Sequence, residues 1–173
     1  MRKIIVAALL VSLIAVAAFK KRDHGINIPK GWPAPVHDVS REPVTAKKVL
    51  LGRMLFYDPI LSRDSTISCA GCHASFTAFA HTDHNLSHGI DGRIGTRNAT
   101  ALMNLAWNKQ FMWDGSVAHL DEQAIRPITD PREMDETMAH IITKLQHSDR
   151  YPRLFHEAFG NSAVDQKKVL SAI

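Results

Sequence analysis

The chain has 173 residues, enough for one domain with a hydrophobic core. Its formal net charge is +4, but five of its 21 basic residues lie within the first 22 positions, which contain no acid. In the remainder, 16 basic residues face 17 acidic ones. This balance excludes a basic patch of the kind that holds phosphates, so we expect no nucleic-acid partner.

Residues 1–19 have the pattern of an export signal. Two basic residues precede an apolar run over 4–19 that a single serine interrupts. A small-x-small tripeptide at 15–17 offers a cleavage site, whereas the basic cluster at 20–22 is unusual after a cleaved signal. An uncleaved N-terminal anchor is the alternative, although a spanning helix needs about 20 apolar residues. Both alternatives place the folded part outside the cytoplasm.

Residues 20–44 contain four prolines and two glycines with little apolar periodicity, which predicts an extended arm or linker. Thr45 then suits the N-cap of a helix over 46–57, which Asp58-Pro59 ends. The spacing within this helix predicts one apolar stripe, formed by Leu50, Met54 and Tyr57.

Cys69-Ala70-Gly71-Cys72-His73 spells C-x-x-C-H, the attachment motif of a c-type haem. Two thiols three positions apart lie on one face of a helix, which Ser65 or Thr66 can cap, and each thiol can form a thioether to a haem vinyl group. His73 then supplies the proximal iron ligand. A thioredoxin-type redox pair would need a βαβ pattern around it. A zinc site would need a further pair of Cys or His ligands at defined spacing. Neither pattern is present.

The rest of the chain predicts loops and short helices. Residues 74–100 are rich in glycine and histidine and predict a loop. Helices are expected over 120–126, ending before Pro127, over 135–147 with a stripe at 138, 141, 142 and 145, over 151–159 and from 164 onward. No alternating strand pattern or internal repeat is found, so the fold class is all-α. Because the last amphipathic helix has no C-cap or polar tail, we expect the chain to be a fragment.

Several blocks of the sequence together resemble the bacterial dihaem cytochrome c peroxidases and their relative MauG. These blocks follow one another at family spacing, at 51–59, 61–62, 67–73, 97–99, 113–115 and 122–124. The resemblance implies that 45–173 is the N-terminal, peroxidatic haem domain, a class I cytochrome c-like domain with long loops. In the family a second haem domain follows and feeds in electrons. With one C-x-x-C-H here, we expect that domain only beyond a truncation.

The resemblance also implies roles for residues after the motif. Trp113 matches the tryptophan between the two haems, although on its own it would be interpreted as a core aromatic. Gln123, Pro127 and Glu133 match the distal-pocket glutamine, proline and glutamate. Without the family, Glu133 would be interpreted as a surface acid. In the family position it can exchange protons with peroxide, while Gln123 orients peroxide or water and Pro127 shapes the pocket wall.

Two implied metal ligands come from the loop. His88 lies near the position of the family's distal histidine, the sixth iron ligand of the resting state, but the loop is longer here, and His81 and His84 compete for that role. Asn98 matches an asparagine that contributes to a calcium site between the two domains. The remaining histidines, including His37, are expected on the surface or on a helix face and have no assigned role.

The resulting hypothesis is a periplasmic peroxidase that reduces hydrogen peroxide to water with electrons from a small cytochrome c or copper protein. A homodimer is a possible assembly of this enzyme. One alternative is a single-haem electron carrier whose iron takes Met103, Met112 or Met134 as its second ligand. Another is a MauG-like enzyme that oxidises a protein. The Gln123, Pro127 and Glu133 set favours the peroxidase, because a carrier does not need it.

Overall fold

The computed structural model describes residues 26–38 and 43–173, so the expected signal at 1–19 lies outside the described residues. The described part is helical, and instead of sheets it has three isolated bridges between residues of the loops. This confirms the all-α class. The helices are α2 (Ala46–Tyr57), α3 (Cys69–Cys72), α4 (Leu120–Gln123), α5 (Ile125–Thr129), α6 (Met138–Gln146), α7 (Tyr151–Phe159) and α8 (Gln166–Ala172), with 3₁₀ turns η1 (Pro59–Leu61), η2 (Ser75–Thr77), η3 (Ile90–Gly92) and η4 (Leu105–Trp107).

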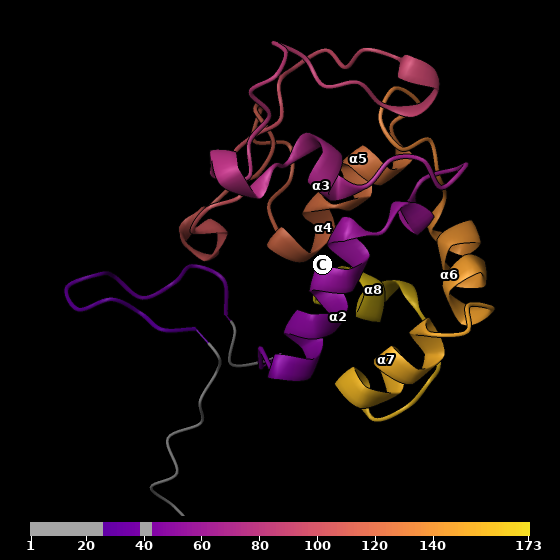
Figure 1. Cartoon of the computed structure of the whole chain (residues 1–173). Helices are drawn as coiled ribbons and strands as arrows, with labels where there is room; N and C mark the ends of the chain where they lie inside the picture. The colour runs from indigo at the N-terminus through magenta and orange to yellow at the C-terminus, as the bar shows by residue number, and fades with distance from the viewer. Residues whose placement is uncertain (1–25, 39–42) are drawn as a thin grey trace, which may run out of the picture.

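Helices α2, α6, α7 and α8 pack around the hydrophobic core, with α2 beside α7 and α8 (Figure 1). The core is formed by fully buried side chains of these helices, including Leu51, Leu55, Ile141, Leu145 and Phe155. Burying apolar surface stabilises the fold by about 25 cal/mol per Å² removed from water, and Leu61, Ile128 and Met134 add to the same core. The helices therefore form a rigid base on which the remaining chain is arranged.

The predicted apolar stripe of α2 is wrong. Leu50 is 44% exposed and Tyr57 50% exposed, whereas Leu51 and Leu55 are fully buried. The helix is apolar on more than one side, so its own spacing does not decide which side meets the core. Gly52 decides it, because a Cβ there would overlap the carbonyl oxygen of Ala172 at the end of α8. Only glycine lets the two helices approach this closely.

Most predicted helix ends are close to the observed ones. Thr45 caps α2 by accepting a hydrogen bond from the Lys48 amide at 3.2 Å, and Gly160 ends α7 with φ +82°. Asp135 has a φ of +49°, so α6 begins three residues later than predicted.

Two further expected helix boundaries differ from the structure. A helix was expected to stop before Pro127, but α5 runs through it. Pro127 lies in the first turn of α5, where its missing N–H costs no helical hydrogen bond. The haem-motif helix begins after Ser68, and neither Ser65 nor Thr66 caps it, since Ser65 takes a left-handed φ of +58°.

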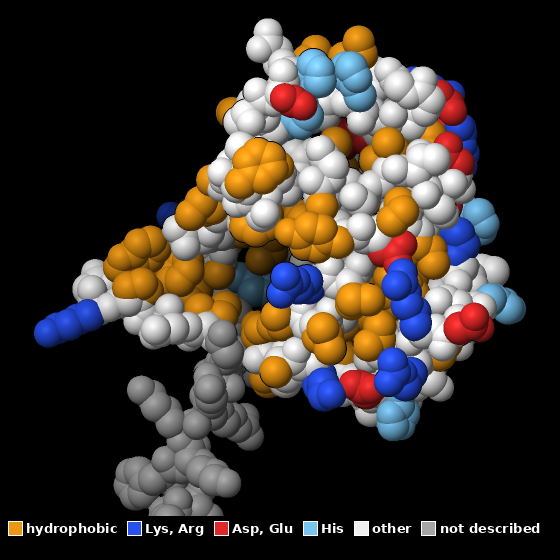
Figure 2. Space-filling model, in the orientation of Figure 1, with side chains coloured by type: hydrophobic (Ala, Val, Ile, Leu, Met, Phe, Trp, Pro, Cys, Tyr) orange, Lys and Arg blue, Asp and Glu red, His pale blue; other side chains and the backbone are white. Residues whose placement is uncertain are grey.

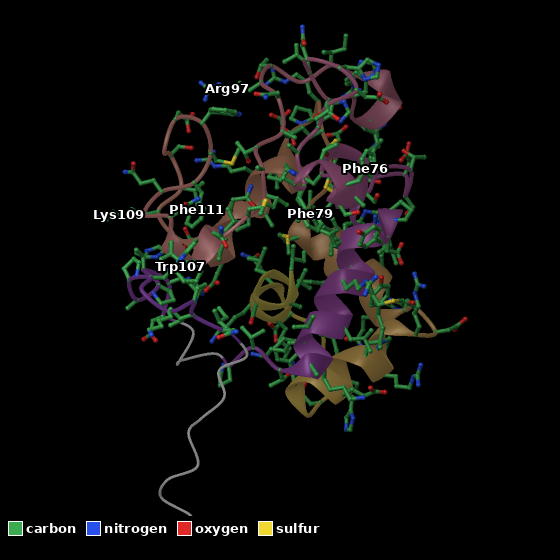
Figure 3. The ribbon with its side chains drawn as sticks, turned by 60° about the vertical axis from the view of Figure 1, so that its left-hand side comes forward. Phe76, Phe79, Arg97, Trp107, Lys109 and Phe111 are labelled. Atoms are coloured by element: carbon green, nitrogen blue, oxygen red, sulfur yellow. The ribbon has the colours of Figure 1, made fainter. Side chains whose placement is uncertain are left out.

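The described part of the N-terminal arm, 26–38, packs against η4. Trp32 meets Trp107 edge to face with ring centroids 5.2 Å apart, and the Trp107 indole N–H donates to the Pro33 carbonyl at 2.9 Å. The amides of Val36 and His37 both donate to one carbonyl in η4. Figure 3 shows Trp107 beside this arm. Among the described residues, no helix combines the length and the hydrophobicity that crossing a membrane requires.

Candidate functional site

A cavity of about 1190 Å³ lies between α2 and α3 on one side and the loop over 95–114 with α4 and α5 on the other. Figure 2 shows a hollow on this face, with hydrophobic side chains around it and a basic side chain at its edge. Its volume slightly exceeds the range of ordinary small-molecule pockets, so it accommodates a large cofactor. Cys69, Cys72 and His73 all line it.

The C-x-x-C-H segment forms a single helical turn. Helix α3 spans the four residues from Cys69 to Cys72, and His73 caps it with its amide donating to the Cys69 carbonyl at 2.9 Å. This turn brings both thiols and the imidazole to one wall. Burial raises the pKa of Cys69 to about 11 and also raises the pKa of Cys72, so both sulfurs are neutral thiols.

His73 is oriented by the chain that follows it. Its Nδ1–H donates to the Phe79 carbonyl at 2.8 Å, so in the neutral ring Nε2 carries the lone pair, and the Thr100 backbone also lies within reach of the ring. Ala78 and Phe79 both have positive φ, and this turn directs the carbonyl back to the ring. Burial lowers the pKa of His73, so the ring is neutral, as a metal ligand must be. Phe79 lines the cavity, while Phe76 from the preceding turn is 87% exposed (Figure 3).

Gln123, Pro127 and Glu133 line the same cavity as the C-x-x-C-H turn. Gln123 comes from α4, Pro127 from α5 and Glu133 from the turn after α5. Burial, reinforced by the negative charge of Asp130, raises the pKa of Glu133 above its ordinary value. The structure therefore gathers the three residues that sequence reasoning assigned to one pocket, and it places a carboxyl group there whose proton exchange is shifted towards neutral pH.

Trp113 and Asn98 also meet at this cavity. The Trp113 indole N–H donates to the Asn98 backbone carbonyl at 2.8 Å, and the indole is 57% exposed. Both residues border a second hollow of about 450 Å³, together with Arg97 and Asp114. Trp113 thus connects the cavity with the surface. Within 26–38 and 43–173, no cluster of three or more His, Cys, Asp or Glu side chains is arranged to hold a metal ion.

His88 does not line the cavity. Its ring stacks on His84 with centroids 4.9 Å apart, and His84 stacks on His81 at 5.6 Å. Histidine side chains gather at the top of Figure 2, away from the hollow. A role of His88 as distal iron ligand therefore requires its loop to rearrange.

Of two other cavity residues, His37 was missed from the sequence, and Met112 was named only as an iron ligand of the electron-carrier alternative. Met112 lines the cavity, and its sulfur accepts a hydrogen bond from the Gln123 side-chain amide at 3.6 Å. His37, expected on the surface, also lines the cavity, and its Nε2 lies 3.5 Å from an Asp121 carboxylate oxygen. Nothing in the sequence indicated that the arm would bring His37 to this wall.

The residues present fit a covalently attached haem. The turn with both thiols and the oriented imidazole forms one wall, and apolar side chains such as Phe56 and Phe79 cover the surroundings. Basic side chains of Arg53 and Arg126 also line the cavity, and guanidinium groups suit the carboxylates of haem propionates. This combination defines a c-type haem domain.

The chain belongs to the di-haem cytochrome c peroxidase family, whose model matches residues 46–173. It is 31% identical over 170 residues to the methylamine utilization protein MauG of Methylophilus methylotrophus, covering 98% of this chain and 49% of that protein. It is also 39% identical over 133 residues to the cytochrome c peroxidase Ccp of Escherichia coli, covering 76% of this chain and 28% of that protein.

Solved structures show the same relationship. A MauG-like protein associated with microbial copper homeostasis matches with a TM-score of 0.75 and 30% identity, covering 85% of this chain and 44% of that chain. The dihaem peroxidase BthA of Burkholderia thailandensis matches with a TM-score of 0.64 and 26% identity, covering 73% of this chain and 37% of that chain. The chain thus spans about half the length, or less, of these relatives. The family implies c-type haem as the cofactor.

Proposed function

We propose that this chain is the peroxidatic haem domain of a peroxidase that reduces hydrogen peroxide to water. The observation that carries the proposal is the convergence of Gln123, Pro127 and Glu133 on the cavity whose wall carries the C-x-x-C-H turn. Each molecule of peroxide takes two electrons and two protons and gives two molecules of water. An electron carrier has no use for a buried group that exchanges protons beside its iron.

Cys69 and Cys72 hold the haem by thioethers, each formed when a thiol S–H adds across a vinyl C=C bond. His73 Nε2 would bind the haem iron, with the ring held in orientation by the Phe79 carbonyl. When bound, haem c supplies the iron at which peroxide binds and electrons that cleave its O–O bond. Haem that extracts into acidified acetone would contradict the covalent attachment.

Glu133 moves the proton that the reaction requires. Its carboxylate would take a proton from one peroxide oxygen and return it to the other, which would depart as water. The raised pKa of Glu133 suits this exchange because an acid–base group works best when its pKa is near the working pH. Gln123 orients peroxide through its side-chain amide, and Pro127 forms part of the cavity wall without adding a hydrogen-bond donor.

We further propose that residues 45–173 form one class I cytochrome c-like domain with long loops, preceded by a signal or anchor at 1–19 and an arm at 20–44. The protein would work in the periplasm. Trp113 would pass electrons from a second haem in a domain beyond this chain, and Asn98 would share a calcium ion with that domain. The electron donor would be a small cytochrome c or copper protein.

A second candidate function is electron transfer by a single haem with fixed ligands. The observation that favours it is Met112, which lines the cavity and whose sulfur is a known type of haem ligand. A MauG-like oxidation of a protein substrate would use the same cavity and the same residues, so it is a variant of the first proposal.

Carbon monoxide binding separates the two candidates. The haem-loaded protein is reduced, mixed with carbon monoxide, and its Soret band followed. The peroxidase proposal predicts rapid binding with a shifted band, because one iron position is open to ligands. An unchanged spectrum would show a fixed second ligand and favour the carrier. A Met112→Leu variant that gains carbon monoxide binding would then identify that ligand.

A further inference from the structure

The segment around η3 packs closely against the backbone of Glu133 and forms a hydrogen bond with it. The Ile90 amide donates to the Glu133 carbonyl at 2.7 Å, a short hydrogen bond. A Cβ at Gly89 would overlap the Arg132 carbonyl, and it would lie 2.5 Å from the Glu133 carbonyl oxygen and 2.6 Å from the Glu133 Cα. Gly89 has a φ of −101°, which other residues adopt readily. Glycine is therefore needed here for the close approach to Glu133 and not for the backbone conformation.

A cluster of ion pairs on the surface also connects η3 with the segment that carries Glu133. The Arg63 guanidinium donates to Asp135 at 2.6 Å and to Asp91 at 2.8 Å. Arg93 donates to Asp91 at 3.1 Å and to the Pro131 carbonyl at 2.7 Å. Each side chain is partly exposed, so a single pair contributes little to stability. Together they tie η3 and the turn before α3 to the segment over 131–135.

The backbone next to Glu133 is fixed on both sides. The Glu133 amide donates to the Asp130 carbonyl at 3.0 Å, and the Met134 amide donates to the Pro127 carbonyl at 3.2 Å. The Met134 carbonyl accepts from the Arg63 amide at 3.0 Å. The side chain of Glu133 thus projects to the cavity from a peptide segment that has little freedom to move.

We propose that Gly89 is a positioning residue for Glu133, and that the Arg63, Asp91, Arg93 and Asp135 cluster supports it. The inference rests on the proposed function of Glu133 as the proton-exchanging group. A general acid–base group loses much of its effect when it is displaced by about 1 Å. Gly89 is what allows η3 to hold Glu133 at the required depth in the cavity.

A glycine pair in one loop tests this inference. In the haem-loaded full chain, we expect Gly89→Ala to slow the reaction with hydrogen peroxide by about tenfold to a hundredfold, at normal haem content. Gly92→Ala in the same 3₁₀ turn is the matched control: it adds the same methyl group, but no atom of the described chain lies within 4 Å of a Cβ there, and Gly92 is not among the residues that line the cavity. Its rate should remain within about twofold of the parent. A parental rate in Gly89→Ala would overturn the inference.

A double-mutant cycle shows whether Gly89 acts through Glu133. If it does, Gly89→Ala combined with Glu133→Gln reacts as slowly as Glu133→Gln alone. A double variant slower than Glu133→Gln, by the factor that Gly89→Ala shows by itself, would overturn the inference. A parental rate in Glu133→Gln alone would instead overturn the proposed function, so the two failures are distinguishable.

If Gly89→Ala does not fold, the Asp91→Asn variant provides a second test of the inference. Asparagine tolerates the φ of +54° at this position and removes the charge that pairs with Arg63. We expect a twofold to fivefold slower reaction and a shifted stretching frequency of carbon monoxide on the reduced haem, which reports the groups facing the ligand. Glu157→Gln breaks a surface ion pair with Lys47 of the same 2.8 Å length and should change neither. Equal results in the two variants would overturn the role of the cluster.

Discussion

The helical region and the loop region of this molecule are held in place by different means. In α2, α6, α7 and α8, fully buried apolar side chains pack into one core. In residues 74–119, no helix exceeds three residues, and the buried apolar side chains there, Ile90, Phe111 and Val117, lie outside that core. The loop region instead depends on backbone hydrogen bonds and on left-handed residues such as Phe79 and Met112.

The cavity lies where the two regions meet, and this position explains how its groups are oriented. The loop region supplies the carbonyl that orients His73 and the amide that holds Glu133. The helical region supplies the rigid wall of α2 against which a cofactor can rest. Stability therefore resides mainly in the helices, whereas the orientation of reactive groups depends on the loops. Mutations in the two regions should have separable effects.

Loss of the imidazole on the cavity wall should have the largest effect. We expect His73→Gly to lose the normal c-type absorption spectrum and all peroxide turnover, because His73 is the imidazole held on the wall beside both thiols. Visible spectra of the purified protein measure this. His119→Gly is the control, since it removes a histidine from the N-cap of α4, where glycine is tolerated. Unchanged Soret and α bands in His73→Gly would show that another residue is the ligand.

A pair of leucines in α2 tests where stability resides. Leu55 is fully buried, so Leu55→Ala should lower the free energy of unfolding by about 2–5 kcal/mol, since it leaves a cavity in the core. Leu50 is 44% exposed, and Leu50→Ala should cost less than about 1 kcal/mol. Urea unfolding of both variants measures the difference. Equal costs would mean that the core does not distinguish the two faces of α2.

The same division explains what the sequence could predict. Capping and terminating residues predicted the ends of α2 and α7 closely, because those signals are local and the structure follows them. The buried face of α2 was missed because a contact with Ala172, far along the chain, selects it. The haem motif was predicted from its own spacing, whereas the distal residues were implied by the resemblance to the family. The position of His37 and the role of the Phe79 carbonyl depend on loop backbone, which leaves no periodic signal.

The pH dependence of the peroxide reaction should reflect the burial of Glu133. Its carboxylate is the base, and burial raises its pKa, so the rate should fall as pH drops through a midpoint above 4.5, the ordinary value. Below this midpoint the rate should decrease about tenfold per pH unit. Stopped-flow rates measured across a range of pH show this decrease at low pH, and the decrease should be absent in the Glu133→Gln variant. A midpoint at or below 4.5 would show that Glu133 is not the group being titrated.

The docking of the N-terminal arm should give the smallest effect. Trp32→Ala removes the edge-to-face contact with Trp107, and an aromatic pair contributes about 0.5–1.5 kcal/mol beyond its burial. We expect faster hydrogen exchange and proteolysis within 26–38, with unchanged exchange in α6 and α7. Ile28→Ala, another half-exposed apolar residue of the arm, is the control. If Trp32→Ala and the parent exchange at equal rates, the arm is held by its backbone bonds alone.

The most direct test of the account is the rate at which the reduced, active protein reacts with hydrogen peroxide in the Glu133→Gln variant. Glutamine keeps the shape of the side chain and removes its ability to exchange a proton. We predict a rate lower by about 10²–10⁴-fold in stopped-flow mixing, with haem content and electron uptake from the donor unchanged. Glu122→Gln, which changes an exposed acid in α4, should react at the parental rate. A Glu133→Gln variant that reacts as fast as the parent would contradict the account, because the proton transfers would then belong to water or to another residue.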